Sequence, residues 1–554
     1  MNADETLDPV TTEVIGSALL AITDEMSSAL VRTAYSPNIK ERVDCSTALF
    51  DTEGRVLAQS QRLPLHMGSL LGSVRHIHER FPSESLRAGD MFLANDPYHG
   101  GGSHLPDFNL VAPIFAGDEL IGYAANTAHH SDVGGMVPGS ESADCQEIYQ
   151  EGIRIPPVRL CAGGELREDV IAVVALNSRV PHDREGDLRA QIAANRVAER
   201  RLLELCDRYG TRHLTNHFAS LLEATERRIR ARFALIPPGD YLHDEYLDPL
   251  PDGTEQRIRV RLRADGRTLR FDFAGTSPQM PFARNIPYYA LAATAFCVVK
   301  TMLDPEIATN DGFYRSIELE APEGSLVNPA SPAAVGARAL SCGVLADALA
   351  GVLSQAASDR AVAGSAPHQL VIFAGEDPRN GEYFVNYETI AGALGARASH
   401  DGLDAVRIYA SGAANLPIEA LEQAFPLRVE RYELLADSGG AGRFRGGLSI
   451  RRDYRMLAPQ VELSLSGERH HVPARGIAGG AAGSPGRFVV NPDTDAAVEL
   501  PSVARNMRLR EGDVLRVDTP GGAGFGPVSD REPDRLRSDL EQGRVTAPDE
   551  QVRR

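Results

Sequence analysis

Apolar residues recur along the first half of the chain with spacings that predict both helices and strands. Residues 11–35 carry them at intervals of three and four, as in a helix, and Ser36-Pro37 ends the pattern. The segments 45–51 and 54–60 read as the two strands of a hairpin. Residues 120–128 are small and apolar after a turn, which predicts a buried strand.

Two long amphipathic helices are predicted next, at residues 187–208 and 216–235, and the Pro-Gly sequence of 236–239 ends the second. Beyond this break, polar and apolar residues alternate on both sides of Ala264-Asp265-Gly266, which predicts two strands joined by a turn. Two further apolar stretches predict buried helices: residues 288–303 and 341–357.

From residue 427 the chain becomes β-like and glycine-rich, and its last segment is charged, so that a short helix or disorder fits it. We therefore predict four parts: an N-terminal domain (1–236), a central α/β domain (237–426), a β-rich domain (427–528) and a charged tail (529–554). The predicted fold is mixed α/β (α+β) and multidomain, with a helix-rich N-terminal part and a β-rich, glycine-rich C-terminal part.

Four of the fifteen histidines fall between Asp96 and Asp132, interleaved with carboxylates and glycines. They form two clusters around the predicted strand: Asp96, His99, His104 and Asp107 before it, and His129, His130 and Asp132 after it. Imidazoles and carboxylates are the ligands that divalent metal ions select, and strand ends often carry binding chemistry. The clustering predicts a metal site, although His and Asp in turns can also simply hydrogen-bond the backbone.

Composition excludes several classes of protein. The net charge of −19 argues against a surface that binds nucleic acid. The cysteines contain no C-x-x-C pair, and we recognise no signal peptide and no run that approaches a membrane span, so a cytoplasmic protein is expected. Lys40 and Lys300 are the only lysines, and neither lies in a G-x-x-x-x-G-K-[ST] loop, so this chain is not expected to bind ATP through that motif.

Ordered sequence blocks cover nearly the whole chain: DPVTTEVI, SPNIKERVDCSTALFD, NDPYHGGGSHLPD, HHSDVGG, QEGIRIPPV, ARNIPYYALAATAF, NDGFYRSIELEAPEGSLVNPASPAAVGAR, SGGAGRFRGGL and TPGGAGFGP. Together they resemble the hydantoinase B family. This family includes the B subunit of N-methylhydantoinase, the corresponding half of 5-oxoprolinase, and the α subunits of acetone and acetophenone carboxylases.

The resemblance, carried over residue by residue, implies four metal ligands: Asp44, His104, Asp107 and His129. Only the resemblance recommends Asp44, whose alternative role is an ion pair with Arg42 or another arginine. His130 and Asp132 are the next candidates, as alternative ligands or as residues that orient the ligands. Asp96 and His99 are expected to shape the loop, with Asp96 forming an Asx turn before Pro97. The ion is a divalent metal, with zinc, manganese and iron left open.

Further candidates surround this set. The candidate catalytic residues are Asp132, His130 and Glu151. The candidate substrate-binding residues are Arg284, Asn285, Asn310, Arg315 and Arg338. Each of these Asn and Arg residues could equally satisfy backbone carbonyls in turns.

The resemblance also implies a reaction. In the hydantoinase and oxoprolinase branches, a partner A subunit binds ATP and phosphorylates the lactam or imide oxygen, and the B-type subunit then hydrolyses the activated ring. A metal lowers the pKa of water enough to supply hydroxide near neutral pH. We therefore expect the metal-bearing subunit of an ATP-dependent cyclic amide hydrolase, in a hetero-oligomer such as α2β2 with an A-type subunit.

Three alternatives stay open. The chain could be the corresponding subunit of an ATP-dependent ketone carboxylase, although the α subunits of acetone carboxylases are longer. It could be a non-catalytic assembly partner, or a hydrolase that acts alone. One block also departs from the family pattern, because N-T-P-x-E is represented here by Asn415, Pro417 and Glu419 without the threonine. If that block contacts substrate, the ligand is not the usual hydantoin or oxoproline.

Overall fold

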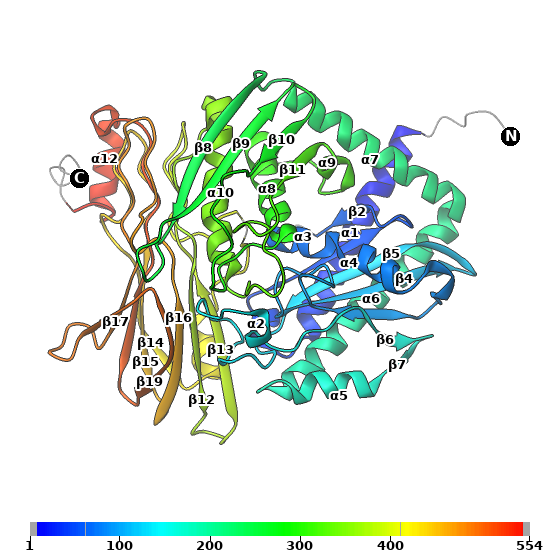
Figure 1. Cartoon of the computed structure of the whole chain (residues 1–554), viewed down its shortest axis with the longest axis horizontal. Helices are drawn as coiled ribbons and strands as arrows, with labels where there is room; N and C mark the ends of the chain where they lie inside the picture. Colours follow the sequence, from blue (N-terminus) through cyan, green and yellow to red (C-terminus); the bar gives the residue numbers. More distant parts are fainter. Residues whose placement is uncertain (1–7, 61–62, 410, 547–554) are drawn as a thin grey trace.

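A seven-stranded sheet organises the N-terminal half of the chain (Figure 1). The structure is a computed structural model that describes residues 8–60, 63–409 and 411–546. The strands of this sheet are β1 (Cys45–Phe50), β2 (Val56–Gln59), β3 (Met91–Ala94), β4 (Asp107–Ala116), β5 (Glu119–His129), β6 (Val158–Ala162) and β7 (Glu165–Leu166). Their order is β2-β1-β5-β4-β3-β6-β7, and neighbouring strands are antiparallel.

Helices cover both faces of this sheet. They are α1 (Pro9–Thr33), α2 (Pro37–Lys40), α3 (Pro64–Leu71), α4 (Ser73–Arg80), α5 (Glu168–Leu176), α6 (Pro181–Tyr209) and α7 (Thr211–Phe233). Successive side chains of a strand point to opposite faces. On β1, Leu49 belongs to the core formed with α1 and α6, whereas Ala48 and Phe50 belong to the core formed with α3.

A second sheet, of four strands, packs on two buried helices. Its strands are β8 (Gly239–Leu247), β9 (Gln256–Ala264), β10 (Leu269–Asp272) and β11 (Ile317–Glu320), in the order β11-β10-β9-β8. On β9, Ile258, Val260 and Leu262 are fully buried and alternate with arginines. Their face packs on α8 (Tyr288–Leu303) and α10 (Arg338–Ala356), in the same core as α3; the short α9 (Asp311–Tyr314) lies between α8 and β11 in the sequence.

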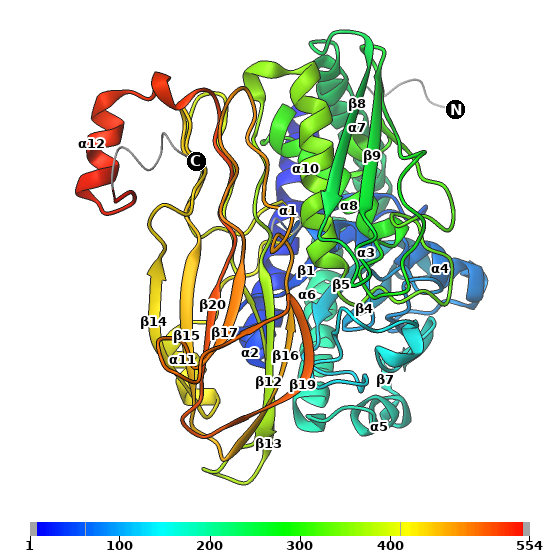
Figure 2. The same cartoon turned by 60° about the vertical axis from the view of Figure 1, so that its left-hand side comes forward.

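The C-terminal part is a sandwich of two antiparallel sheets. One has the order β13-β12-β16-β19 and comprises β12 (Gln369–Glu376), β13 (Tyr383–Ile390), β16 (Gln460–Ser466) and β19 (Val503–Arg510). The other has the order β14-β15-β20-β17-β18 and comprises β14 (Leu427–Leu434), β15 (Ile450–Met456), β17 (Arg487–Val490), β18 (Val498–Leu500) and β20 (Val514–Asp518). Figure 2 shows the first of these sheets on the side of the N-terminal half. The remaining helices are α11 (Ile418–Ala424) and α12 (Pro533–Glu541).

Most predicted elements are confirmed, and the mixed α/β class is correct. The helix at 11–35 is α1, the hairpin is β1–β2, the strand at 120–128 is β5, and the two long helices are α6 and α7. The predicted strands around residues 264–266 are β9 and β10, and the two buried helices are α8 and α10. Residues 529–546 contain the short helix α12, and residues 547–554 lie outside the described part. The first sheet of the sandwich joins strands from both sides of residue 427, and the domain boundaries stay predictions.

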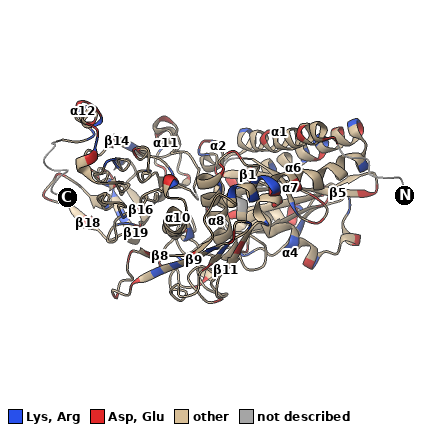
Figure 3. Ribbon diagram, turned by 90° about the horizontal axis from the view of Figure 1, so that it is seen from above, with Lys and Arg blue, Asp and Glu red and all other residues tan. Residues whose placement is uncertain are grey.

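Within the described residues, two helices have the length and mean hydropathy of a membrane span, which the sequence analysis did not anticipate: α1 and α10, each at 1.4. In α10, 78% of the most apolar window is buried inside the chain, and in α1 the share is 39%. Both helices therefore use apolar faces for packing within the chain, as core helices do. Acidic and basic residues are interspersed along the ribbon (Figure 3).

Candidate metal centre

The ends of three neighbouring strands meet at the candidate site. In the β4–β5 ladder Asp107 lies directly opposite His129, the last residue of β5. In the β1–β5 ladder Cys45 lies opposite Ala128, and the N–H of His129 donates to the carbonyl of Asp44 at 3.0 Å. Antiparallel pairing thus brings residues that are far apart in sequence to one edge of the sheet.

His104 reaches the same edge from the glycine-rich loop before β4. Gly101 has a φ of +80°, and a Cβ atom there would lie 2.5 Å from the backbone of Gly72, so the loop passes close to the junction of α3 and α4. A turn then follows, in which the N–H of Asp107 donates to the carbonyl of His104 at 3.2 Å. This turn directs the His104 ring toward the Asp107 carboxylate.

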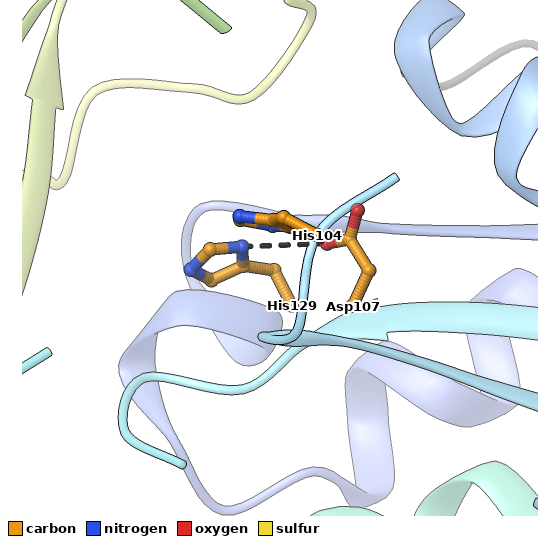
Figure 4. Close-up of side chains that lie close together, drawn as sticks. All are labelled: His104, Asp107 and His129. Atoms are coloured by element: carbon orange, nitrogen blue, oxygen red, sulfur yellow. Dashed lines mark ion pairs between the residues drawn. The ribbon is translucent and has the colours of Figure 1, made fainter. Parts of the chain in front are cut away.

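His104, Asp107 and His129 form a compact group of potential ligands (Figure 4). Oδ1 of Asp107 lies 3.0 Å from Nε2 of His104 and 3.4 Å from Nδ1 of His129. Two ligands about 2.1 Å from one ion are about 3.0–3.4 Å apart at coordination angles between 90° and 109°. The spacing therefore fits a divalent metal.

Unused polar atoms support the same interpretation. Nε2 of His104 and Oδ1 of Asp107 are both buried, and neither has a hydrogen bond of good geometry among the described residues. Buried polar atoms without partners are rare in native proteins, and an ion is one explanation for them. The donor set of two imidazoles and a carboxylate suits zinc, manganese or iron.

Arg338, at the start of α10, holds the other oxygen of the carboxylate. Its Nη2 donates to Oδ2 of Asp107 at 3.0 Å and to the Ser103 hydroxyl at 2.7 Å. Burial alone would raise the pKa of Asp107, but His104 and Arg338 hold that pKa well below its usual range. Burial and the charge of Arg338 lower the pKa of His104 to about 3. Near neutral pH the pair therefore has the protonation that metal binding requires.

His66, at the start of α3, completes the surroundings of Asp107, and the sequence analysis missed it. Its Nε2 lies 3.7 Å from Oδ1 of Asp107 and 3.6 Å from Oδ1 of Asp44. Asp44 thus approaches the group of three through His66. It has no ion pair with Arg42, which binds neutral oxygens instead. A single histidine in the apolar segment RLPLHMGSL carries no signal that would have identified it.

A buried glutamate is a second residue that the sequence analysis missed. Oε2 of Glu141 accepts from the hydroxyl of Tyr387 on β13 at 2.7 Å and lies 3.9 Å from Nδ1 of His104. Burial raises the pKa of Glu141. The Tyr387 ring also packs on His129, with ring centroids 4.5 Å apart. The sandwich therefore contributes to the wall of the site.

The three candidate catalytic residues lie around this group rather than in it. His130 stacks on Phe108 and contacts Oε1 of Gln191 through Nε2 at 3.0 Å. Asp132 accepts from the N–H groups of the following loop and pairs with Arg179 at 2.9 Å. Glu151 accepts from the N–H groups of Val335 and Gly336 at 2.8 and 2.6 Å, and the carbonyl of Gly336 lies 3.2 Å from Nδ1 of His104.

Of the five candidate substrate-binding residues, only Arg338 reaches the group. Arg284 pairs with Glu468, and Arg315 pairs with Glu226. Asn285 bonds backbone groups of Met280, Phe282 and Ala334. Asn310 caps α9 through Gly312 and donates to the Thr225 hydroxyl. The side chains of these four residues are thus engaged by the fold.

The first half of the loop behaves as expected. Oδ1 of Asp96 accepts from the N–H groups of Tyr98 and His99 at 2.9 and 3.0 Å, which is the predicted Asx turn. Its Oδ2 pairs with Arg154 at 2.6 Å. His99 lines a separate cavity of 860 Å³.

The chain is similar to a caprolactamase subunit over nearly its whole length. The β subunit of caprolactamase from Pseudomonas jessenii is 33% identical over 98% of this chain and 94% of that subunit. The crystal structure of the ATP-dependent caprolactamase from the same organism superposes with a TM-score of 0.91, at 30% identity, over 98% of this chain and 95% of that chain.

More distant relatives share the fold. 5-Oxoprolinase 1 of Arabidopsis thaliana is 28% identical over 95% of this chain, which matches 42% of that protein. A nucleotide-free structure of acetone carboxylase has a TM-score of 0.90 at 21% identity, over 98% of this chain and 79% of that chain. The family model for hydantoinase B/oxoprolinase matches residues 8–528, and the chain belongs to this family.

Proposed function

We propose that this chain is the metal-bearing B-type subunit of an ATP-dependent cyclic amide hydrolase. The observation that carries the proposal is the buried group His104, Asp107 and His129, whose ligand atoms lie within 4.8 Å of one another. The relatives that are at least 30% identical include a caprolactamase subunit, which supports an amide substrate. The chain would form a cytoplasmic hetero-oligomer with an A-type subunit. That subunit would bind ATP and phosphorylate the amide oxygen.

The proposed reaction has two steps, phosphorylation of the ring and its hydrolysis, and each would take place on a different subunit. A cyclic amide is resonance-stabilised, and phosphorylation of its oxygen removes that stabilisation. Water then adds to the ring carbon, the C–N bond breaks and the nitrogen takes a proton, which leaves an acyl phosphate. A second water releases inorganic phosphate. A divalent metal, when bound, lowers the pKa of water and polarises an oxygen of the substrate.

The residues of this chain would perform three tasks. His104, Asp107 and His129 would hold the metal, and Asp44 and His66 lie close enough to assist. Glu141, whose pKa is raised by burial, would hold or release a proton near the metal ligands, while Oε2 is oriented by the Tyr387 hydroxyl that donates to it. A set of positioning residues, His130, Asp132, Glu151 and Arg338, would orient the ligands and their loops.

Metal content tests the site directly. We would measure it by inductively coupled plasma mass spectrometry on the purified chain and on His104→Ala, Asp107→Ala and His129→Ala. The proposal predicts about one divalent metal per wild-type chain and its loss in all three variants. Circular dichroism should show that each variant remains folded. Absence of a stoichiometric metal from the wild type would refute the proposed site.

Activity tests the reaction. The chain would be combined with its A-type partner and ATP and supplied with hydantoins and lactams, and ring-opened products would be identified by mass spectrometry. Ring opening that needs both subunits and ATP supports the hydrolase. Turnover of a ketone that depends on bicarbonate would instead identify the carboxylase branch, and ring opening by this chain alone would exclude an obligatory partner.

A further inference from the structure

Two arginines next to the metal centre lack a carboxylate partner. Arg42 is 1% exposed and donates to the side-chain oxygen of Asn38 at 2.7 Å and to the carbonyl of Tyr387 at 2.9 Å. Arg407 donates to the Ser411 hydroxyl at 2.8 Å. Both guanidinium groups also donate to the single hydroxyl of Thr389, which places them side by side.

This pairing of two positive charges has no carboxylate in direct contact among the described residues. Arg42 and Arg407 have no ion pair within 4.0 Å in the part of the chain that the structure describes, and Nε of Arg407 is buried without a hydrogen-bond partner. Burial and the neighbouring charge of Arg42 lower the pKa of Arg407, and Asp44, Tyr387 and Glu388 offset this only in part. Buried charges in proteins are usually paired, and two adjacent guanidinium groups repel each other.

A buried histidine lies on the neighbouring segment of chain: Gly392 pairs with Val406, next to Arg407, and its backbone lies against the carbonyl of Pro367, next to His368. His368 is 6% exposed, and its ring has no hydrogen bond to any described residue. Burial and the charges of Arg407, Arg42 and Arg338 lower its pKa well below the usual range. The ring is therefore neutral near pH 7, and it can donate one N–H to an anion.

The pair is close to the candidate metal. The Tyr387 ring contacts both sides, because the guanidinium of Arg42 lies 5.4 Å from its centroid and the His129 ring lies 4.5 Å from it. Asn38 makes a second link, since it donates to the carbonyl of His129 at 2.8 Å and accepts from Arg42. One layer of side chains thus separates the arginine pair from the metal ligands.

The segment directly before the sequence block that departs from the family pattern lies against this pair. Ser411 bonds Arg407, and the N–H of Ala414 donates to the carbonyl of Arg42 at 3.1 Å. Pro417 precedes α11, and Asn415 contacts the hydroxyl of Tyr432 at 2.8 Å. Ser411 and Ala414 therefore border the arginine pair, and the block that lacks the threonine of the family pattern follows them directly.

We propose that Arg42, Arg407 and His368 form an oxyanion subsite that holds the phosphoryl group of the activated substrate beside the metal. The inference rests on the proposed function for the identity of the anion, because phosphorylation adds two negative charges to an otherwise neutral amide. Guanidinium groups bind phosphate oxygens through charge-assisted hydrogen bonds. The subsite would orient the phosphate away from the ring carbon that water attacks.

Inorganic phosphate is the probe for this subsite. We would titrate the full-length chain with phosphate by isothermal titration calorimetry, without ATP or partner, and compare Arg407→Gln and His368→Gln with the wild type. Arg407→Gln should weaken binding at least tenfold, and His368→Gln should weaken it by less. Arg228→Gln is the matched control, because Arg228 lies on the distant α7, where it pairs with Asp304. Arg232 also pairs with Asp304, so this carboxylate keeps a partner in the variant. Its phosphate affinity should stay within twofold of the wild type.

Two further titrations distinguish the sources of an oxyanion signal. His104→Ala removes a metal ligand, and retention of phosphate binding in this variant supports the arginine subsite. Phosphate binding that His104→Ala abolishes and Arg407→Gln preserves would overturn it, and so would the absence of binding to the folded wild type. Acetate that binds more tightly than phosphate would replace the phosphoryl assignment with a substrate carboxylate. None of these results depends on ring-opening activity, so failure of the proposed reaction would be recognised separately.

Discussion

Arg338 binds one oxygen of Asp107 and leaves the other oxygen to the histidines. Nη2 of Arg338 lies 3.0 Å from Oδ2, while Oδ1 faces Nε2 of His104 at 3.0 Å. Ser103 donates to Oδ2 as well, at 2.8 Å, so that this oxygen has two partners. The carboxylate is consequently held in one orientation, with Oδ1 available to an ion.

Arg338→Gln should therefore weaken metal binding while leaving all ligands in place. Loss of a residue that orients a ligand typically costs about 10–100-fold in metal affinity. Affinity would be measured by competition with a chromophoric chelator, with folding checked by thermal denaturation. Arg338→Lys keeps the positive charge but cannot hold Ser103 and Asp107 in the same fork geometry, so it should restore affinity only in part. Unchanged affinity in both variants would contradict this role of Arg338.

His129 and His130 are adjacent in sequence, yet we predict opposite consequences of their substitution for metal binding. His129→Ala should abolish metal binding, and it also loses the packing of the ring on Tyr387. His130→Ala should retain the metal but lower the free energy of unfolding by about 2–4 kcal/mol, because it leaves Gln191 without a partner and opens space against Phe108. Metal analysis and urea denaturation of the two variants measure both quantities. Metal loss in folded His130→Ala would reverse the assignment.

The sequence predicted the ends of β1 and β5 at the site, but neither β4 nor how the three strands meet. The interval between Asp107 and His129 is occupied by one hairpin, so their proximity follows from β-strand periodicity and antiparallel pairing. Asp44 is 63 positions before Asp107, and only the resemblance suggested it; its place beside His129 depends on β1 pairing with β5. Such long-range pairing leaves no local pattern in one sequence.

Residues contributed by a helix, a loop and the sandwich were beyond prediction for a different reason. His66, Glu141 and Tyr387 lie in segments with no repeated ligand spacing, and each reaches the site only through packing of separate layers. The same holds for Arg42 and Arg407, which meet at Thr389 on β13. Conversely, Arg284, Asn285, Asn310 and Arg315 were predicted as pocket residues from their residue type, and the structure uses them in turns and ion pairs.

Glu151 should give the protein a measurable dependence of stability on pH. Burial raises its pKa to about 8, although the N–H groups of Gly336 and Val335 lower it. The unfolded value is about 4.3, so between about pH 4.3 and 8 the folded chain binds a proton that the unfolded chain does not. The contribution of Glu151 to the free energy of unfolding is therefore fully present below about pH 4.3. Between about pH 4.3 and 8 it declines by up to about 1.4 kcal/mol per pH unit.

Glu151→Gln removes this decline and keeps a side-chain oxygen for both N–H groups. The variant should match the wild type near pH 5 and exceed it in free energy of unfolding near pH 8. Urea denaturation at the two pH values tests this. The expectation fails if the difference between variant and wild type does not grow with pH.

Gly101 and Gly117 form a matched pair that isolates the effect of loop packing on the metal. Both have positive φ, +80° and +63°, so alanine pays a similar backbone cost of about 1 kcal/mol at either position. A Cβ atom on Gly117 meets nothing within 4 Å, whereas one on Gly101 would lie 2.5 Å from the backbone of Gly72. Gly101→Ala must therefore displace the loop that carries His104.

We expect Gly101→Ala to cost at least about 2 kcal/mol more than Gly117→Ala, because the contact is with backbone that cannot rotate away. Its metal affinity should fall as well, since His104 would move relative to Asp107, while Gly117→Ala should bind metal like the wild type. Urea denaturation and metal titration of the two variants give both comparisons. Equal metal affinity in the two folded variants would show that His104 tolerates movement of its loop, and would argue against it as a ligand held at 3.0 Å from Asp107.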